Sequence, residues 1–268
     1  MFNPFVDPPS ATLFTISGVS LYWYGMCVAL GIFVAMWGWK RDLRHLKFTE
    51  HTAQHLIFWV VFSGIIGARF YHIINDIEYY WVHPWDVFAI YNGGVAIHGA
   101  LFAGFLYLCW YARFHKTNIV PLSRLIASLV PWLAFGQAIG RWGNYFNQEL
   151  FGNPTFLPWA IPIDSSHRLS GFESLSYFHP VFLYESIGLI VVGIIVLRMR
   201  KIYSFYEQIG AYCIGIGFLR LGMELLRIDI VPRILGARLP MLVGGGILFV
   251  GILIFWYGYN VRNKNFGG

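Results

Sequence analysis

Seven apolar stretches constrain this sequence more than any other feature. A transmembrane helix needs about 20 consecutive, mostly apolar residues, with a range of about 17 to 25. The stretches run approximately over residues 20–39, 54–74, 93–112, 122–146, 180–198, 207–227 and 241–260. We therefore expect an all-α integral membrane protein with seven transmembrane helices.

The composition agrees with this interpretation. Hydrophobic residues make up 57% of the 268 residues and charged residues only 12%, whereas about 25% of the residues in a soluble domain are charged. The sequence has no polar linker, low-complexity tract or evident internal repeat. We predict a single polytopic membrane domain over residues 1–268, with a short outer loop segment of about residues 147–179.

The basic residues predict how the chain crosses the membrane. Twelve of the nineteen Lys and Arg residues fall in connections that the seven stretches place on one side. Cytoplasmic loops carry such an excess, so we expect the N-terminus to be extracytoplasmic and the C-terminus cytoplasmic. No basic segment is long enough to indicate a nucleic-acid partner.

The other seven basic residues are all arginine and lie near the outer ends of the stretches or in outer loops. They are Arg69, Arg141, Arg168, Arg220, Arg227, Arg233 and Arg238. A guanidinium is a planar, permanently charged group that suits phosphate, whereas the lysine ammonium is a hydrated point charge. Outer arginines without lysine predict a site for an anionic lipid. Snorkelling to the membrane interface is the alternative for Arg168, Arg233 and Arg238.

A polar cluster directly follows the apolar run that ends at Ile139. It reads Gly140-Arg141-Trp142-Gly143-Asn144-Tyr145-Phe146-Asn147-Gln148-Glu149-Leu150-Phe151-Gly152. Polar groups at membrane depth are costly and mark function. Arg141, Asn144 and Gln148 share one face if the helix continues, and the glycines let a helix or a lipid headgroup approach. We expect a headgroup site here; a polar helix end with an ordinary cap is the alternative.

Arg220, Glu224 and Arg227 form a second polar group, spaced by four and then three residues. On one helix face the carboxylate would orient both guanidiniums and leave donors for a ligand. An ion pair that only holds helices together would have the same spacing.

Three further groups have both a functional and a structural interpretation. His98 lies near the outer start of the third stretch and is either a general base, because imidazole titrates near neutral pH, or a hydrogen-bonded structural residue. Tyr24 belongs to an aromatic group that would also suit the membrane interface. The segment from His179 to Glu185 is explained by a helix start and interhelical hydrogen bonds. The three cysteines are isolated in apolar runs, and we expect neither a metal nor a cofactor.

On these motifs the chain resembles the bacterial prolipoprotein diacylglyceryl transferases, from Tyr22 to about Arg227. The strongest element is the polar cluster of residues 140–152, which is similar to the family signature. The supporting elements, in the same order along the chain, are Tyr22-Trp23-Tyr24-Gly25, Gly67-Ala68-Arg69, Gly93-Gly94 leading to His98-Gly99, His179-Pro180-Val181-Phe182-Leu183-Tyr184-Glu185, and Phe218-Leu219-Arg220 with Glu224.

The resemblance implies a seven-helix enzyme of the bacterial inner membrane with its active site toward the extracytoplasmic leaflet. Such enzymes move the diacylglyceryl group of phosphatidylglycerol onto the lipobox cysteine of a preprolipoprotein, which gives a thioether and releases glycerol-1-phosphate. By similarity, Arg141 and Arg220 correspond to the family's essential arginines and His98 to an important histidine. The lipid-binding residues that we expect are Arg141, Tyr24, Asn144, Asn147, Glu149, Gly152, Glu224 and Arg227.

The sequence departs from the family pattern in three places, to which we assign no role. Val181-Phe182 replace a common Ser-Gln pair, the loop of residues 153–178 is short, and the last stretch lacks the usual Ser-Met-Gly-Gln. A phospholipid transporter or flippase would also need arginines and a bilayer cavity. However, transporters often show internal repeats and broken midplane helices, whereas here the polar residues gather toward one leaflet. A scaffold that presents lipid to another protein is a third alternative.

Overall fold

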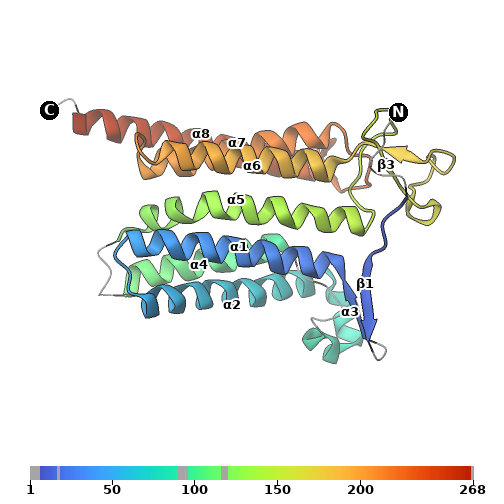
Figure 1. Ribbon diagram of the computed structural model, residues 1–268, viewed down its shortest axis with the longest axis horizontal. Helices are drawn as coiled ribbons and strands as arrows, with labels where there is room; N and C mark the ends of the chain where they lie inside the picture. The colour runs from blue at the N-terminus through green and yellow to red at the C-terminus, as the bar shows by residue number, and fades with distance from the viewer. Residues whose placement is uncertain (1–6, 17–18, 90–93, 95, 116–119, 267–268) are drawn as a thin grey trace. The chain divides into compact units, whose positions relative to one another are not determined.

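The computed structural model describes residues 7–16, 19–89, 94, 96–115 and 120–266 (Figure 1). Within them, seven helices have 18 or more residues, and each overlaps one of the seven apolar stretches. They are α1 (Trp23–His45), α2 (Glu50–Asn75), α4 (Ile97–Phe114), α5 (Leu122–Phe146), α6 (Val181–Met199), α7 (Phe205–Glu224) and α8 (Leu239–Phe266). The protein is mainly helical, as predicted.

Four of the described helices are long and apolar enough to cross a membrane. They are Glu50–Asn75, Leu122–Phe146, Val181–Met199 and Leu239–Lys264. A membrane protein is therefore supported, and the number of seven spans and the sides of the termini stay predictions.

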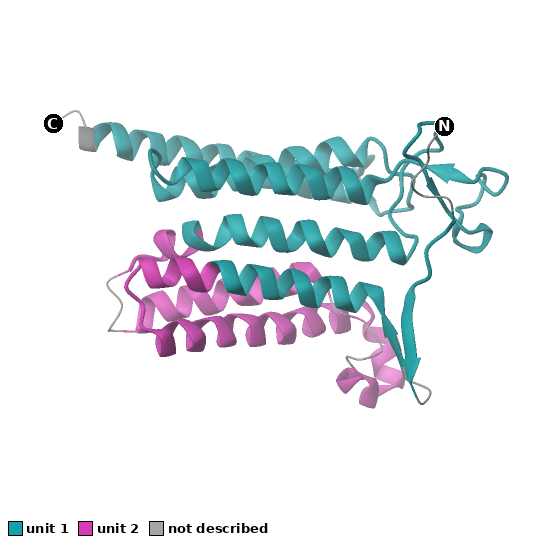
Figure 2. Cartoon of the chain, viewed as in Figure 1, with its two compact units in different colours: residues 1–38, 127–268 teal, residues 39–126 magenta. Residues whose placement is uncertain are grey.

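The chain divides into two compact units, which we describe separately (Figure 2). The first unit contains residues 1–38 and 127–268, and the second contains residues 39–126. The unit boundaries fall within α1 and α5.

In the first unit, glycines allow helices to pack at close range. A Cβ on Gly217 of α7 would lie 2.6 Å from the backbone nitrogen of Leu248 in α8, and a Cβ on Gly31 of α1 would lie 2.5 Å from the carbonyl oxygen of Gly136 in α5. Only hydrogen fits at such positions, so the glycines set the helix separation. In Figure 1, α6, α7 and α8 lie side by side.

The loop between α5 and α6 folds over the end of the first unit. Its short strands β3 (Ile161–Pro162) and β4 (Tyr177–Phe178) pair antiparallel. A small core of buried side chains holds the loop on the start of α6: Phe151, Ile161, Ile163, Phe178 and Phe182. Phe182, one of the two residues that depart from the family pattern, also stacks on Tyr145 with ring centroids 4.9 Å apart. Phe182 thus has a packing role in this chain.

Two hairpins complete the first unit. Strands β1 (Thr12–Ile16) and β2 (Val19–Tyr22) pair antiparallel before α1. Strands β5 (Arg233–Ile234) and β6 (Ala237–Arg238) pair antiparallel between α7 and α8.

The second unit is built on α2 packed against α4. Gly67 and Gly99 meet there, since a Cβ on Gly67 would lie 2.5 Å from the carbonyl oxygen of Gly99. Helix α3 (Ile77–Val82) and the 3-10 helix η1 (Pro84–Phe88) follow α2. Arg69, which is buried, donates hydrogen bonds to the carbonyl oxygens of Val87, Asp86 and Gly94. For this arginine the structure thus gives a role in fixing the loop after α2.

Candidate active site

Two arginines from different helices share one carboxylate in the first unit. Nε of Arg141 in α5 lies 2.9 Å from Oε2 of Glu185 in α6. Nη1 of Arg220 in α7 lies 3.5 Å from Oε1 of the same Glu185. The Glu185 side chain is only 7% exposed, while those of Arg141 and Arg220 are 29% and 23% exposed. A buried anion therefore holds two partly accessible cations side by side.

This arrangement leaves donors and net positive charge for a ligand. A guanidinium has five N–H donors, and Arg141 uses Nε for Glu185 and Nη1 for Asn144. In the described part of the chain, Nη2 of Arg141 has no protein partner within hydrogen-bond distance. One carboxylate cannot neutralise two guanidiniums, so the pair suits an anion such as a phosphate diester.

A hydrogen-bond chain runs from Arg141 to the loop that follows α5. Nη1 of Arg141 donates to Oδ1 of Asn144 at 3.5 Å, and Nδ2 of Asn144 donates to Oε1 of Glu149 at 2.7 Å. Asn144 is buried and Glu149 exposed. The structure thus brings three of the residues expected to bind lipid into one chain of contacts.

The prediction that Arg141, Asn144 and Gln148 share one helix face is wrong for Gln148. Helix α5 ends at Phe146, and Gln148 has a φ of +51°, so it lies outside the helix. Its amide nitrogen donates to Oδ2 of Asp164 at 2.7 Å, and its amide oxygen accepts from the backbone N–H of Asp164 at 2.7 Å. Gln148 is buried and fastens the outer loop. It does not extend the face of Arg141.

The predicted grouping of Arg220, Glu224 and Arg227 is confirmed for the approach of Glu224 and Arg227 and is wrong in placing all three on one helix. Helix α7 ends at Glu224, so Arg227 lies beyond it. Glu224 pairs with Arg238 from β6, with Nε and Oε1 2.6 Å apart, and lies 4.0 Å from Nη1 of Arg227. Arg227 also pairs with Asp229, with Nε and Oδ1 2.8 Å apart. The ion pair of Arg220 is with Glu185.

Arg238 thus forms an ion pair with Glu224, a contact that the snorkelling alternative did not predict. Its Nη2 also donates to the carbonyl oxygen of Asp229 at 3.0 Å. Arg168 likewise bonds within the loop, with Nε donating to the carbonyl oxygen of Ile163 at 2.9 Å and Nη1 to that of Glu173 at 2.8 Å. Both side chains stabilise segments that connect the helices.

Two glycines of the signature have steric roles. A Cβ on Gly143 would lie 2.7 Å from Cδ2 of Tyr24, so the tyrosine ring packs directly against the backbone of α5 at this glycine. A Cβ on Gly152 would lie 2.8 Å from Cβ of His179 and 3.1 Å from the carbonyl oxygen of Leu226. Close packing accounts for Gly152, and its expected contact with lipid stays a prediction.

His179 is tied to the start of α6. Its Nδ1 lies 3.1 Å from the hydroxyl of Tyr184, which also accepts a hydrogen bond from Nε1 of Trp159 at 2.8 Å. Burial lowers the pKa of the His179 imidazole, because the protonated ring loses solvation. The structural role predicted for this residue agrees with these contacts.

His98 belongs to the second unit, at the start of α4, where its ring centroid lies 6.2 Å from that of Tyr71. Its role as a base stays a prediction. The residues from Tyr91 to Gly93 that precede it lie outside the described part of the chain.

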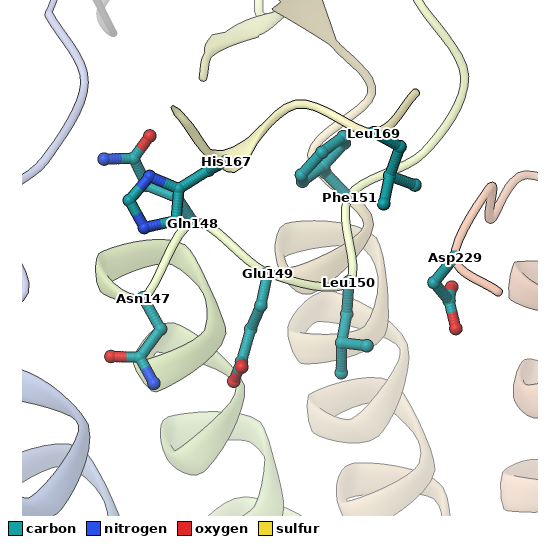
Figure 3. A pocket seen from close by; sticks show the side chains of 8 residues that line it. All are labelled: Asn147, Gln148, Glu149, Leu150, Phe151, His167, Leu169 and Asp229. Carbon is teal, nitrogen blue, oxygen red and sulfur yellow. The ribbon is translucent and has the colours of Figure 1, made fainter. Parts of the chain in front are cut away.

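A cavity of about 340 Å³ opens beyond the end of α5 (Figure 3). Its walls come from three segments and include two residues of the signature that were expected to bind lipid, Asn147 and Glu149. The lining residues are Asn147, Gln148, Glu149, Leu150, Phe151, His167, Leu169 and Asp229. Across the described residues, no group of three or more His, Cys, Asp or Glu side chains is arranged to hold a metal ion.

Sequence reasoning missed the roles of Glu185 and Arg238. Glu185 was assigned to a helix start and interhelical hydrogen bonds, and Arg238 to the membrane interface. Their partners lie on other elements, so no helical spacing links them. The one signal in the sequence is charge: in the group of Arg220, Glu224 and Arg227, one carboxylate cannot neutralise two guanidiniums, so a second acid is needed.

Comparisons with known proteins agree on one family. The family model "Prolipoprotein diacylglyceryl transferase" matches residues 11–257. A phosphatidylglycerol–prolipoprotein diacylglyceryl transferase from Fervidobacterium nodosum is 33% identical over 92% of this chain and 84% of its own length. Proteins of the same name from Acaryochloris marina and Synechococcus elongatus are 35% and 34% identical, over 91% and 96% of this chain and 90% of their own lengths.

Proposed function

The chain belongs to the prolipoprotein diacylglyceryl transferase family and transfers a diacylglyceryl group from phosphatidylglycerol to a prolipoprotein, and we propose that Arg141 and Arg220 hold the lipid phosphate during this transfer. The observation that carries the proposal is the shared carboxylate of Glu185, 2.9 Å from Nε of Arg141 and 3.5 Å from Nη1 of Arg220. It fixes two guanidiniums side by side and leaves their remaining donors for one anion.

The reaction needs positive charge at the phosphate. The thiolate sulfur of the acceptor cysteine forms a bond to the terminal glycerol carbon of the diacylglyceryl group. The bond from this carbon to the phosphate oxygen breaks, its electron pair stays on the oxygen, and glycerol-1-phosphate leaves. Negative charge therefore grows on the phosphate as the bond breaks. Donors aimed at that charge in a site poor in water stabilise the transition state, and losing one costs about 3 to 4 kcal/mol.

The acceptor cysteine must lose its proton, either to a base or with the help of nearby positive charge. A free cysteine thiol has a pKa of about 8.5, so most of it is protonated at neutral pH. His98 is the proposed base, by its similarity to the family histidine and because imidazole titrates near neutral pH. The arginine pair supports the same step, because positive charge favours the thiolate.

The topology in this proposal follows from the basic residues. Seven spans with the N-terminus outside put the outer ends of α5, α6 and α7 in the extracytoplasmic leaflet of the bacterial inner membrane. Both substrates reach this leaflet, the lipid by lateral diffusion and the lipobox of the preprolipoprotein within its signal peptide. The contacts of lipid with Tyr24, Asn144, Gly152, Glu224 and Arg227 belong to the same proposal.

The test is thioether formation by the purified protein on a lipobox peptide with phosphatidylglycerol vesicles. We expect Arg141→Ala and Arg220→Ala to reduce kcat/KM by a factor on the order of 10² to 10³ while both variants still insert and fold. Lysine should restore little, because an ammonium cannot donate in the same planar geometry. Arg233→Ala, an exposed arginine of β5, is the matched control and should keep full activity. Normal turnover by Arg141→Ala would overturn the assignment.

The transporter alternative predicts a different result in the same vesicles. A flippase would move labelled phosphatidylglycerol between leaflets without any peptide. The curated relatives named above are called transferases, which supports the transfer reaction.

A further inference from the structure

The cavity beyond α5 is lined by both polar and apolar side chains. Leu150, Phe151 and Leu169 supply apolar surface, while Asn147, Glu149, His167 and Asp229 supply polar groups. Figure 3 shows that residues 147–151 form one continuous segment, that His167 and Leu169 come from a second and Asp229 from a third. The volume of about 340 Å³ lies at the lower end of the range for ligand pockets.

Two hydrogen bonds connect this cavity to the arginine pair. Glu149, on the cavity wall, accepts from Asn144 at 2.7 Å, and Asn144 accepts from Arg141 at 3.5 Å. A substrate that reacts beside Arg141 therefore has this cavity close by, past the end of α5.

The charge of the lining disfavours a phosphate. Glu149 and Asp229 are both carboxylates, and like charges disfavour binding of an anion. Asp229 is neutralised by Arg227, 2.8 Å away. The partner of Glu149 is the neutral amide of Asn144, and in the described part of the chain no cation lies within ion-pair distance of it. The cavity thus suits an uncharged polar or a cationic group.

A peptide backbone has this chemistry. The two substrates differ in charge at this point: phosphatidylglycerol carries a phosphate, whereas the acceptor polypeptide continues past its cysteine as a chain of amides. The apolar lipobox before the cysteine suits the membrane, and the chain after it must leave toward water. Backbone amide groups are able to pair with the carboxylate, amide and imidazole of the wall, and Leu150, Phe151 and Leu169 offer apolar surface to the side chains.

We propose that this cavity receives the segment of the preprolipoprotein that directly follows the acceptor cysteine. The inference rests on the transferase function proposed above and adds a binding site for the second substrate. For Asn147 and Glu149 it replaces the lipid contact suggested by the sequence with a contact to the peptide.

The test compares two lipobox peptides, one amidated at the cysteine and one extended by four uncharged residues. His167→Trp places a large side chain from an exposed position into the cavity. We expect kcat/KM for the extended peptide to fall roughly tenfold, because its chain is displaced from the reactive position. The amidated peptide should react as with the unchanged protein, and the KM for phosphatidylglycerol should not change. Ser170→Trp, in the same loop but outside the lining, is the matched control.

Other outcomes assign the cavity differently. An equal loss for both peptides, or a higher KM for phosphatidylglycerol, would overturn the inference and assign the cavity to the lipid. No effect on either peptide would also overturn it. If the unchanged protein makes no thioether with either peptide, the proposed function itself fails.

A second measurement serves if His167→Trp does not fold. A photoreactive amino acid at position 167 of the full-length protein should cross-link to the extended peptide after its cysteine, as mapped by mass spectrometry. Cross-links confined to the lipid, or to residues before the cysteine, would contradict the inference.

Discussion

Oε2 of Glu185 lies 2.9 Å from Nε of Arg141, so the carboxylate contacts the guanidinium at the nitrogen closest to the backbone. Since the two N–H groups of Nη2 stay available to a ligand, the ion pair orients the Arg141 side chain and still leaves it donors for binding. The same carboxylate approaches Arg220 at 3.5 Å, and thus sets the separation of the two cations.

Glu185→Gln tests whether the negative charge of this side chain is needed to position Arg141 and Arg220. The variant keeps the shape of the side chain but removes the counter-charge of two arginines, which then repel each other. We expect kcat/KM for the transfer to fall by a factor on the order of 10². Ser186→Ala is the control, because this neighbour is buried and bonds to the carbonyl oxygen of Ala138 at 2.9 Å. If Glu185→Gln keeps wild-type activity, the carboxylate does not position the arginines.

Gly143→Ala tests the contact between α5 and Tyr24. The added Cβ would lie 2.7 Å from Cδ2 of the tyrosine ring, and overpacking of this kind costs about 1 to 3 kcal/mol. We expect a lower melting temperature in detergent micelles. Gly140→Ala on the same helix is the matched control, because nothing lies within 4 Å of its added Cβ. It should be neutral or stabilise by about 0.5 to 1 kcal/mol; equal losses in both variants would exclude the steric explanation.

The helices could be predicted from the sequence because a long apolar run has few other stable structures in a membrane. Each of the seven runs overlaps a described helix of 18 or more residues. The positions at which the helices end were harder to predict from the sequence. Gln148 and Leu150 take left-handed backbone conformations without being glycine, so no glycine or proline marked where α5 stops.

The arginine pair could be predicted, but its partners could not. Spacing along one helix suggested Glu224 as the acid for Arg220, since residues four apart are neighbours on a helix. The structure pairs Arg220 with Glu185 and Glu224 with Arg238. Which acid meets which arginine depends on the packing of different elements, and a single sequence contains no direct record of it.

The ion pair between Glu224 and Arg238 should stabilise the segment between α7 and α8. The Glu224 side chain is fully buried, and its Oε1 lies 2.6 Å from Nε of Arg238. Arg238→Ala leaves this carboxylate without its closest cation, which costs about 3 to 5 kcal/mol for a buried pair. Arg233→Ala, an exposed residue of the same hairpin, should change the free energy of unfolding by at most about 0.5 kcal/mol.

A double-mutant cycle tests this coupling directly. If the two side chains act as a pair, Glu224→Gln combined with Arg238→Ala should destabilise the protein by less than the sum of the single variants. Residues in direct contact give interaction energies of about 0.5 to 3 kcal/mol. Additive losses would show that the two groups act independently. The free energies come from chemical unfolding in detergent micelles.

His179 should make the stability of the protein sensitive to acid. Burial lowers the pKa of its imidazole in the folded protein, so between the folded and the unfolded pKa the unfolded chain binds more protons. Stability is then fully present above the unfolded value of about 6.5 and is lost as the pH falls through the folded value. We expect the melting temperature to fall below pH 6.5, and to fall less in His179→Asn. His167→Asn, at an exposed position of the same loop, should keep the wild-type dependence; an unchanged slope in His179→Asn would assign the acid sensitivity to other groups.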